Sequence, residues 1–478
     1  MSCISFAELR QRNVNGVSLC DGSVEGETNT RESSAAQCWP ASNGSIPVLK
    51  KEESLDWKRV MAEHPDVLEE VTSAERSPWK YFMGEVYGGN SLQSTISVGN
   101  DKKRQRVYNT MFHVPLRCER LIVAGFFVCL DSFLSLLTIM PVRILMAMWR
   151  ILNKRQFQRP DATELSDFSS FIVLSCGVTA LQLTDVSLIY HIIRGQGTLK
   201  LYVVYNVLEI FDKLLQSLDE DVLQVVFNSA EGLANCPLES TAFGLMRFII
   251  DQLIAIVTFT LHSFILLAQA ITLSTCIIAH NNALLALLVS NNFAEIKSNV
   301  FKRVSKDNLQ SLVYYDIIER FHITAFLLFV LAQNILEAEG SWFGSFLTNA
   351  LLVYVSEIFI DATKHSFLAK FNEIKPIAYS EFLEDLCKQT LSIRPEGDGK
   401  NLNFIPLAPA CVVIRVLTPI YATVLPCGPL PWRMLWIFLW SALTYIILAI
   451  CKILVGLTLN RLAAWYIDQR REGKHHAD

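Results

Sequence analysis

The chain has few charged residues for its length and no signature of a soluble enzyme. Only 18% of its 478 residues are Asp, Glu, Lys or Arg, whereas 51% are apolar. We find no Gly-rich phosphate-binding loop, no His-Glu-x-x-His motif and no nucleophile elbow. These absences argue against a soluble globular enzyme. We therefore expect no catalytic residue set and no cofactor.

Cysteine spacing gives no sign of a structural site either. The twelve cysteines are scattered, without the paired spacing of a zinc site or of a disulfide framework. Several of them, such as Cys129, Cys176 and Cys411, lie within apolar runs, where a free thiol behaves as a small hydrophobic group. We therefore expect neither disulfides nor a metal site. The amino terminus lacks a basic stretch followed by an apolar core, so we expect no cleavable signal peptide.

What the chain has in excess is apolar sequence of bilayer-spanning length. A helix needs about 20 apolar residues to cross the hydrocarbon core of a membrane. Six clear runs lie near residues 121–140, 168–192, 245–279, 345–363, 404–425 and 434–458, and a weaker one lies at 322–336. The mean hydropathy of the whole chain is positive, at +0.31. These runs predict an all-α polytopic membrane protein with about six to seven transmembrane helices plus interfacial amphipathic helices.

The composition changes along the chain and predicts four segments. They are a disordered polar tail over residues 1–77, a juxtamembrane segment rich in aromatic and basic residues over 78–120, a multi-pass membrane domain over 121–465 and a short polar tail over 466–478. The juxtamembrane segment is either an interfacial helix with a charge anchor or a docking site for a partner, and we favour the helix.

Two further segments have the composition of membrane-surface helices. In residues 199–218, Asn206, Glu209, Lys213 and Gln216 form one polar stripe on a mostly apolar helix. This segment either lies in the interface plane or packs against the spans, and we favour the interface. The connection after the third run is the candidate membrane-surface or partner loop, with Asn291, Asn292, Phe293, Glu295, Lys297, Lys302 and Arg303 as its candidate residues.

Basic residues in the connections predict the orientation of the second half of the chain. The connections 281–320 and 364–403 are rich in Lys and Arg, whereas the turns 337–344 and 426–432 contain none. The positive-inside rule places the basic connections and the carboxyl tail in the cytosol and the two turns on the opposite side.

For the first half of the chain, the sequence does not determine whether the number of membrane crossings is odd or even. The run 121–149 is interrupted by Pro141 and Arg143, and the run 245–279 is longer than one crossing needs. Either run could be a hairpin or a re-entrant element.

Polar residues inside the apolar runs are the candidate functional residues. Charged groups in a membrane normally face a protein interior or an aqueous cavity. Glu357, Asp361 and His365 share one helix face by their spacing of four. The candidate intramembrane polar seam comprises Asp131, Asp185, His191, Glu357, Asp361, His365 and Arg415. It is either a proton or cation path or a packed seam that joins helices, and we favour the packed seam.

Several sequence blocks, in order and with regular spacing, resemble the transmembrane anterior posterior transformation protein family. They include residues 129–133 (CLDSF), 190–196 (YHIIRGQ), 290–297 (SNNFAEIK), 316–321 (DIIERF) and 404–407 (FIPL). The resemblance covers roughly residues 78 to 460. Within the family, the sequence is most similar to the plant branch, the pollen defective in guidance proteins.

The resemblance implies a multi-pass protein of the endoplasmic reticulum membrane with no catalytic residues. It also implies a role in the folding, retention and quality control of lumenal proteins, with a calreticulin-type chaperone in plants or a SUN-domain-like membrane partner in fungi. Plant processes such as pollen tube guidance and embryo patterning would depend on it. We expect a scaffold or co-chaperone in contact with the lipid bilayer and not with nucleic acid. The alternative is an ion, solute or lipid transporter that uses the intramembrane carboxylates.

Overall fold

The chain is helical throughout the part that the structure describes. This computed structural model describes residues 78–87, 101–153, 161–195, 198–235, 241–279, 296–298, 300, 302–337, 342–391, 405–425 and 430–475, and these contain no strand. The chain divides into two units, residues 1–96 and 97–478. In the first unit, helix α3 (Pro78–Tyr87) has exposed Trp79 and Phe82 side chains. The predicted disordered tail over 1–77 lies outside the described residues.

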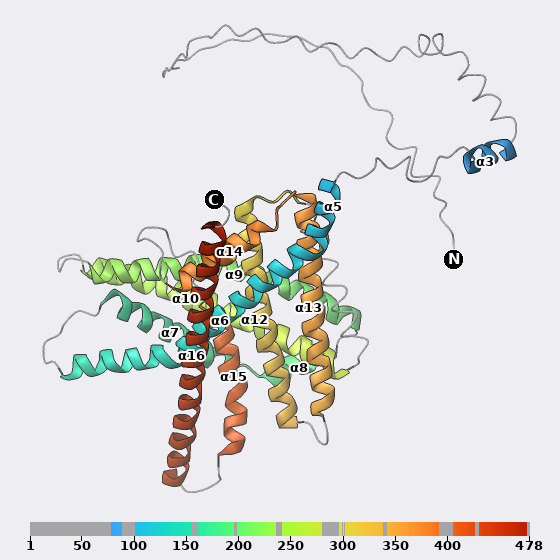
Figure 1. Cartoon of the computed structure of the whole chain (residues 1–478). Helices are drawn as coiled ribbons and strands as arrows, with labels where there is room; N and C mark the ends of the chain where they lie inside the picture. The colour runs from blue at the N-terminus through green and yellow to red at the C-terminus, as the bar shows by residue number, and fades with distance from the viewer. Residues whose placement is uncertain are drawn as a thin grey trace, which may run out of the picture. The chain divides into compact units, whose positions relative to one another are not determined.

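The second unit is built from helices of very different lengths (Figure 1). They are α5 (Asp101–Tyr108), the π-helical turn η2 (Asn109–His113), α6 (Val114–Asn153), α7 (Ala162–Leu183), α8 (Val186–Arg194), α9 (Thr198–Ala234), α10 (Thr241–Ala279), α12 (Lys306–Glu337), α13 (Phe343–Phe371), α14 (Ile377–Thr390), α15 (Leu407–Val424) and α16 (Leu430–His475). Among the described residues, 6 helical stretches are long and apolar enough to cross a membrane, and they cover most or all of α6, α7, α10, α13, α15 and α16. The all-α polytopic prediction is therefore confirmed. The weaker run at 322–336 lies in α12, which is not one of the six.

The two ambiguous runs are continuous helices. Helix α6 passes through Pro141 as one helix of 40 residues, and α10 is one helix of 39 residues. The hairpin or re-entrant alternative is therefore wrong for both. A proline removes one helical hydrogen bond, and neighbouring helices can support the chain at that point. The carbonyl that lacks a helical partner here is that of Leu137, and at the next residue the Tyr445 hydroxyl of α16 donates a 3.2 Å hydrogen bond to the Thr138 carbonyl.

By contrast, the predicted run 168–192 is not one helix. Helix α7 ends at Leu183, and Thr184 and Asp185 both have extended backbone. The Asp185 carboxylate then accepts hydrogen bonds from the backbone N–H groups of Ser187 (3.0 Å) and Leu188 (3.3 Å). Asp185 is thus an N-cap residue that starts α8, which is why the apolar run breaks at this point.

Helix α9 packs against α7 and α10 with its polar stripe turned toward the protein. The side chains of Asn206, Lys213 and Gln216 are partly buried, and Asp212 is buried. The opposite face is apolar and exposed, with Val203, Val207, Ile210, Phe211, Leu214 and Leu218 on it. Of the two alternatives for this segment, packing against the spans is the one observed, because the polar stripe finds its partners on other helices.

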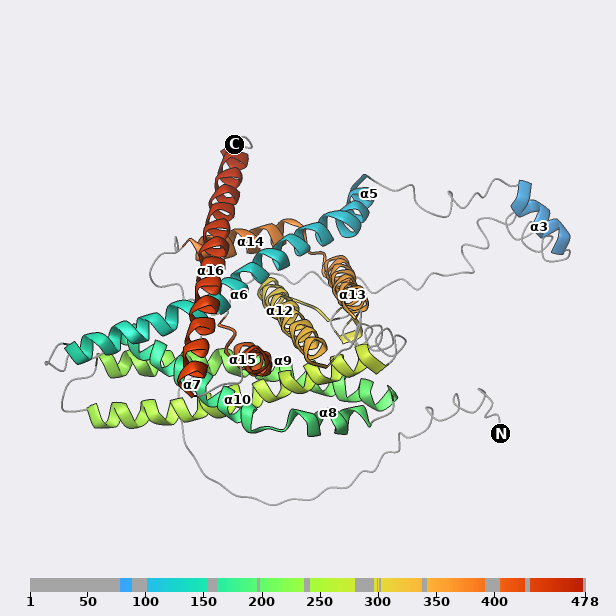
Figure 2. The ribbon, with the colours of Figure 1, turned by 90° about the horizontal axis from the view of Figure 1, so that it is seen from below.

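The long helices of the second unit do not share one axis. Helices α9 and α10 run across α12, α13 and α15 in two perpendicular views (Figures 1 and 2). The carboxyl ends of α12 and α15 and the amino ends of α13 and α16 lie at the lower end of Figure 1, whereas α14 and the carboxyl terminus lie at its upper end. The amphipathic helix α14 packs there against α6 and α16. Residues 466–475, predicted as part of a tail, continue α16.

Two large buried apolar clusters and a small one, formed by Cys387, Ala463 and Ile467, hold these helices together. The larger is centred on α10 and α15, with Leu266, Leu267 and Ala410 fully buried, and the second joins α6, α12 and α14 around Leu121 and Ile317.

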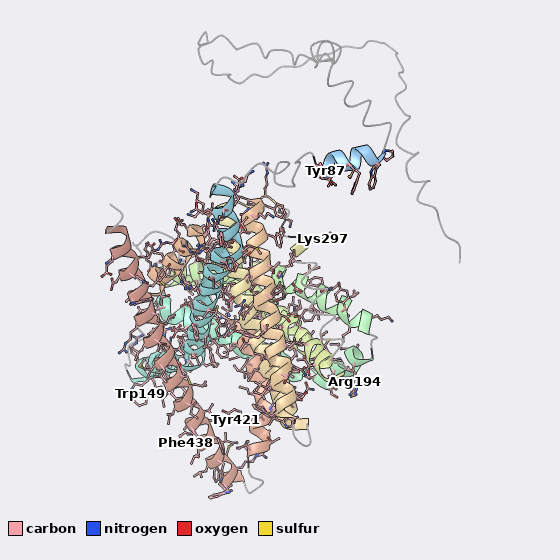
Figure 3. All side chains as sticks on the ribbon, turned by 45° about the vertical axis from the view of Figure 1, so that its right-hand side comes forward. Tyr87, Trp149, Arg194, Lys297, Tyr421 and Phe438 are labelled. Atoms are coloured by element: carbon pink, nitrogen blue, oxygen red, sulfur yellow. The ribbon has the colours of Figure 1, made fainter. Side chains whose placement is uncertain are left out.

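Outside these clusters, many apolar side chains are exposed. Phe438 of α16 is 76% exposed and Trp149 of α6 is 69% exposed, and both lie at the rim of the molecule in Figure 3. Exposed apolar surface of this extent belongs in contact with lipid.

Candidate functional site

Two clusters of buried charged residues meet at helix α12. The first, the ion-pair network, comprises Glu119 of α6, Asp316 and Arg320 of α12, Asp361, Lys364 and His365 of α13 and Tyr379 of α14. The second, the acid–histidine cluster, comprises Asp212 and Asp219 of α9, His262 of α10 and His322 of α12. Local helix geometry places Asp316 and Arg320 one turn apart on α12, and Asp361, Lys364 and His365 on one face of α13.

Arg320 is the centre of one half of the ion-pair network. Its guanidinium donates hydrogen bonds of 2.6 Å to the Asp361 carboxylate and of 2.6 Å to the Glu119 carboxylate. It also lies 6.0 Å from the centre of the Tyr354 ring. Arg320 thus connects α12 to both α6 and α13, and a delocalised guanidinium suits a buried position with several acceptors.

Lys364 and His365 form the other half of the network. The Lys364 ammonium donates to Asp316 (2.7 Å) and to Asp361 (3.0 Å), and all three side chains are buried. His365 Nε2 lies 2.7 Å from Asp316 Oδ2, and its Nδ1 lies 3.1 Å from the Tyr379 hydroxyl.

The charges of the network nearly cancel. Three carboxylates face Arg320, Lys364 and an imidazole. Burial raises the pKa of the Asp316 carboxyl, but Lys364 and His365 lower it by more, so that this pKa lies below the usual range. An arrangement of paired charges of this kind can hold four helices in one relative position.

The acid–histidine cluster is centred on His262. Its Nδ1 lies 2.5 Å from Asp219 Oδ2, and its Nε2 lies 2.7 Å from Asp212 Oδ1. The other oxygen of Asp212 lies 3.3 Å from Nδ1 of His322. All four side chains are buried. Burial raises the pKa of Asp212, but His322 and His262 lower it by more, to below its usual value. For Asp219, burial prevails over the hydrogen bond from His262, and the pKa is raised.

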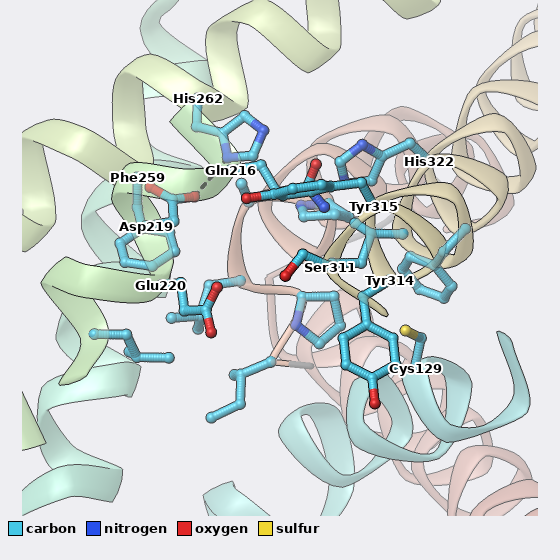
Figure 4. A pocket seen from close by; sticks show the side chains of 18 of the residues that line it. Cys129, Gln216, Asp219, Glu220, Phe259, His262, Ser311, Tyr314, Tyr315 and His322 are labelled. Carbon is cyan, nitrogen blue, oxygen red and sulfur yellow. Dashed lines mark hydrogen bonds and ion pairs between the residues drawn. The ribbon is translucent and has the colours of Figure 1, made fainter. Parts of the chain in front are cut away.

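A cavity of about 430 Å³ borders the acid–histidine cluster. Its lining residues are Cys129, Gln216, Asp219, Glu220, Leu223, Phe259, His262, Asp307, Gln310, Ser311, Tyr314, Tyr315, Ile318, Phe321, His322 and residues 405–409. Figure 4 shows His262 and His322 toward the top of the view and Tyr314 and Cys129 below them. The buried acids and histidines thus border the cavity, where a small solute can contact them.

The structure brings some of the predicted seam residues together and separates others. Asp361 and His365 are members of the ion-pair network, and Glu357 is buried one turn before them on α13. Asp131 lies elsewhere and pairs with Lys452 of α16 at 2.6 Å.

The remaining seam residues have other positions. Asp185 is exposed and caps α8, and His191 is exposed on α8. Arg415 donates a 3.1 Å hydrogen bond from Nε to the Leu181 carbonyl in the last turn of α7. Among the described residues, none of the three has a hydrogen bond or an ion pair with a member of the ion-pair network.

The candidate surface loop is only partly described. Asn291, Asn292, Phe293 and Glu295 lie outside the described residues. Lys297, Lys302 and Arg303 are exposed, and the Lys302 carbonyl accepts a 3.2 Å hydrogen bond from the Asn372 amide.

Sequence reasoning missed Asp212, Asp219, Asp316 and His322 and misassigned two basic residues. Arg320 and Lys364 were counted among basic residues of cytosolic connections, but both are fully buried ion-pair partners. A signal did exist for α9, since Asp212 and Asp219 are seven positions apart and extend the polar stripe of the same helix.

Comparisons with known proteins agree with the resemblance in the sequence. Residues 160–468 match the model of a family described as a eukaryotic membrane protein family. The chain is 56% identical to protein pollen defective in guidance 1 of Arabidopsis thaliana, over 99% of this chain and 79% of that relative.

More distant relatives show the same pattern over a smaller part of the chain. The human transmembrane anterior posterior transformation protein 1 homolog is 32% identical over 72% of this chain and 62% of the relative. A Dictyostelium discoideum homolog is 35% identical over 70% of this chain and 43% of the relative. No solved structure matches the chain.

Proposed function

Because the chain belongs to the transmembrane anterior posterior transformation protein family, we propose that it is a non-enzymatic scaffold or co-chaperone subunit of the endoplasmic reticulum membrane. In this role it acts with a calreticulin-type lumenal chaperone or a SUN-domain-like membrane protein in the folding and retention of lumenal proteins. The Arabidopsis relative is named for defective pollen guidance, and we extend the proposal to pollen tube guidance and embryo patterning.

The observation that carries the proposal is the bonding of Asp361. Its carboxylate is bound by both Arg320 and Lys364, and all three side chains are buried. A carboxylate held by two cations stabilises the contact between helices, whereas a proton or cation path needs an acid that can exchange its partner with water. A rigid arrangement of helices is what a scaffold requires in order to present its surface to partners.

The direct test is recovery of a partner after extraction in mild detergent. The wild-type chain should co-purify with a calreticulin-type chaperone or a SUN-domain-like membrane protein and should co-localise with an endoplasmic reticulum marker. The Asp361→Asn variant should recover less partner, because the network that fixes α12 and α13 is broken. The Asp185→Asn variant is the matched control, because the exposed Asp185 caps α8 and asparagine caps a helix about as well. Recovery of neither partner would contradict the proposal.

A second candidate function is transport of an ion, a solute or a lipid. The observation that favours it is the cavity of about 430 Å³ that reaches Asp219 and Glu220. Neutralising Asp219 and Glu220, the two acids of this cavity, together separates the two functions. A scaffold should lose protein level or partner binding, whereas a transporter that uses these acids should keep its level and location and lose flux.

A further inference from the structure

The acid–histidine cluster contains a set of donor atoms that chemistry associates with metal ions. One carboxylate oxygen of Asp212, one imidazole nitrogen of His262 and one of His322 all lie within 4.8 Å of one another, and the three side chains are buried. They come from α9, α10 and α12, with His262 and His322 at 50 and 110 positions from Asp212. This explains why no metal-type spacing is visible in the sequence, and the expectation of no metal site was drawn from that spacing.

We propose that Asp212, His262 and His322 bind a divalent transition-metal ion of the zinc class, and that Asp219 is a positioning residue for His262. Imidazole nitrogen and carboxylate oxygen are common ligands of zinc. The proposal does not depend on the scaffold function.

The distances between the donor atoms are close to those of a metal site. With metal–nitrogen distances of about 2.0–2.1 Å, tetrahedral geometry separates neighbouring ligand atoms by about 3.4 Å. Oδ2 of Asp212 lies 3.3 Å from His322 Nδ1, and Oδ1 of Asp212 lies 2.7 Å from His262 Nε2. One donor atom from each of the three residues lies within 4.8 Å of the other two, so the three donors already surround one point.

Asp219 makes His262 a suitable ligand. Its carboxylate lies 2.5 Å from His262 Nδ1 and accepts the proton of that nitrogen in a hydrogen bond. The lone pair for a metal is then on Nε2, which faces Asp212. A carboxylate bound to the outer nitrogen of a ligating histidine is a recurring feature of zinc sites, because it fixes both the tautomer and the ring orientation.

The charge of the cluster also fits a dication. Asp212 and Asp219 carry two negative charges in a buried position, where uncompensated charge is costly. One divalent cation offsets these two charges.

The cavity supplies the remaining coordination position. His262, His322 and Asp219 line it (Figure 4), and the second oxygen of Asp219 is buried with no hydrogen-bond partner among the described residues. Three protein ligands and a fourth position open to a solvent-sized space are typical of sites where the metal binds an exchangeable molecule.

The test is metal binding by the full-length chain in detergent, with Zn²⁺ and Co²⁺ as the probes. The neighbouring His475 and His476 can bind metal adventitiously, so all proteins carry His475→Gln and His476→Gln. One metal ion should bind per chain, and Co²⁺ should give the visible absorption of a site with nitrogen and oxygen ligands.

Isosteric variants identify the ligands. Asp212→Asn, His262→Gln and His322→Gln should each weaken binding by more than 100-fold, roughly, and Asp219→Asn by about 10–100-fold, as for other outer partners of ligating histidines. The exposed His191 is the control, and His191→Gln should bind like the parent protein. Absence of stoichiometric binding, or unchanged binding in His322→Gln, would overturn the proposal.

If the variants do not fold, the ligands can be identified in the zinc-loaded parent protein by X-ray absorption spectroscopy at the zinc edge. Scattering from two imidazole rings supports the site, whereas a spectrum without imidazole scattering refutes it. Loss of zinc binding with normal recovery of the chaperone partner would leave the scaffold function intact, so the two proposals can fail separately.

Discussion

Arg320 and Asp361, 41 positions apart, form a hydrogen-bonded ion pair of 2.6 Å whose two side chains are only 1% and 2% exposed. The pair joins α12 to α13, and the other terminal nitrogen of Arg320, Nη1, donates a hydrogen bond to the Glu119 carboxylate of α6. Because three helices meet at one guanidinium, the pair determines how these helices are placed relative to one another.

Asp361→Asn should destabilise the protein by about 3–5 kcal/mol, because it leaves Arg320 and Lys364 buried without full compensation. The measurement is thermal or denaturant unfolding of the purified protein in detergent, together with its level in cells. The exposed Asp185→Asn should change the free energy of unfolding by less than 0.5 kcal/mol, roughly. Equal stability of both variants would show that the pair is not a structural contact.

Gly125→Ala should destabilise the contact between α6 and α12. A methyl group at Gly125 would collide with Cδ1 of the fully buried Ile317 and would lie 2.8 Å from its Cγ1 and 2.9 Å from its Cγ2. Overpacking of this kind costs about 1–3 kcal/mol, measured by unfolding in detergent.

The matched control for this change is Gly232→Ala on α9. Gly232 has no neighbouring atom within 4 Å of the added methyl group. The substitution should be neutral or stabilising by up to about 1 kcal/mol, because alanine favours a helix over glycine. Shortening Ile317 to Val in the Gly125→Ala protein should restore part of the loss, and no restoration would contradict the contact.

Asp131 and Lys452 should show energetic coupling between α6 and α16. The two groups form an ion pair of 2.6 Å and are both partly buried. Asp131→Asn and Lys452→Met should each cost about 1–3 kcal/mol. The double variant should cost less than the sum, with a coupling energy of about 0.5–3 kcal/mol in a double-mutant cycle. Strict additivity would argue that the pair contributes nothing.

The α15–α16 turn and the connection after α14 should lie on opposite sides of the membrane. Helix α15 ends and α16 begins at one end of the second unit, whereas α14 lies at the other end (Figure 1). Arg320 and Lys364 are buried and no longer count as basic loop residues. Lys302, Arg303 and Lys306 are exposed, so the positive-inside rule still predicts a cytosolic position for their connection.

Glycosylation acceptors inserted in the chain test this orientation after translation with microsomes. An acceptor within 426–429 should be modified, and one within 395–399 should not. The reverse pattern would invert the orientation, and modification at both places would refute the arrangement of α15 and α16.

The sequence by itself determined the fold class and the family. Spanning a bilayer is a local requirement of about 20 apolar residues, so composition alone located the six helical stretches. The family followed from blocks such as residues 290–297, because each block is a continuous stretch of sequence and needs no knowledge of the fold. Spacing of three and four likewise placed Asp361 and His365 on one face of α13.

Only the tertiary structure decided what the polar residues contact. Asp212 and His322 are 110 positions apart, and no local pattern indicates that α9 and α12 bring them to one point. The same holds for Arg320, which in sequence resembles a cytosolic basic residue but is buried against Asp361 and Glu119. Hydropathy reports the free-energy cost of placing each side chain in lipid. The partner that offsets this cost lies on another helix, and only the packing of the helices determines which partner that is.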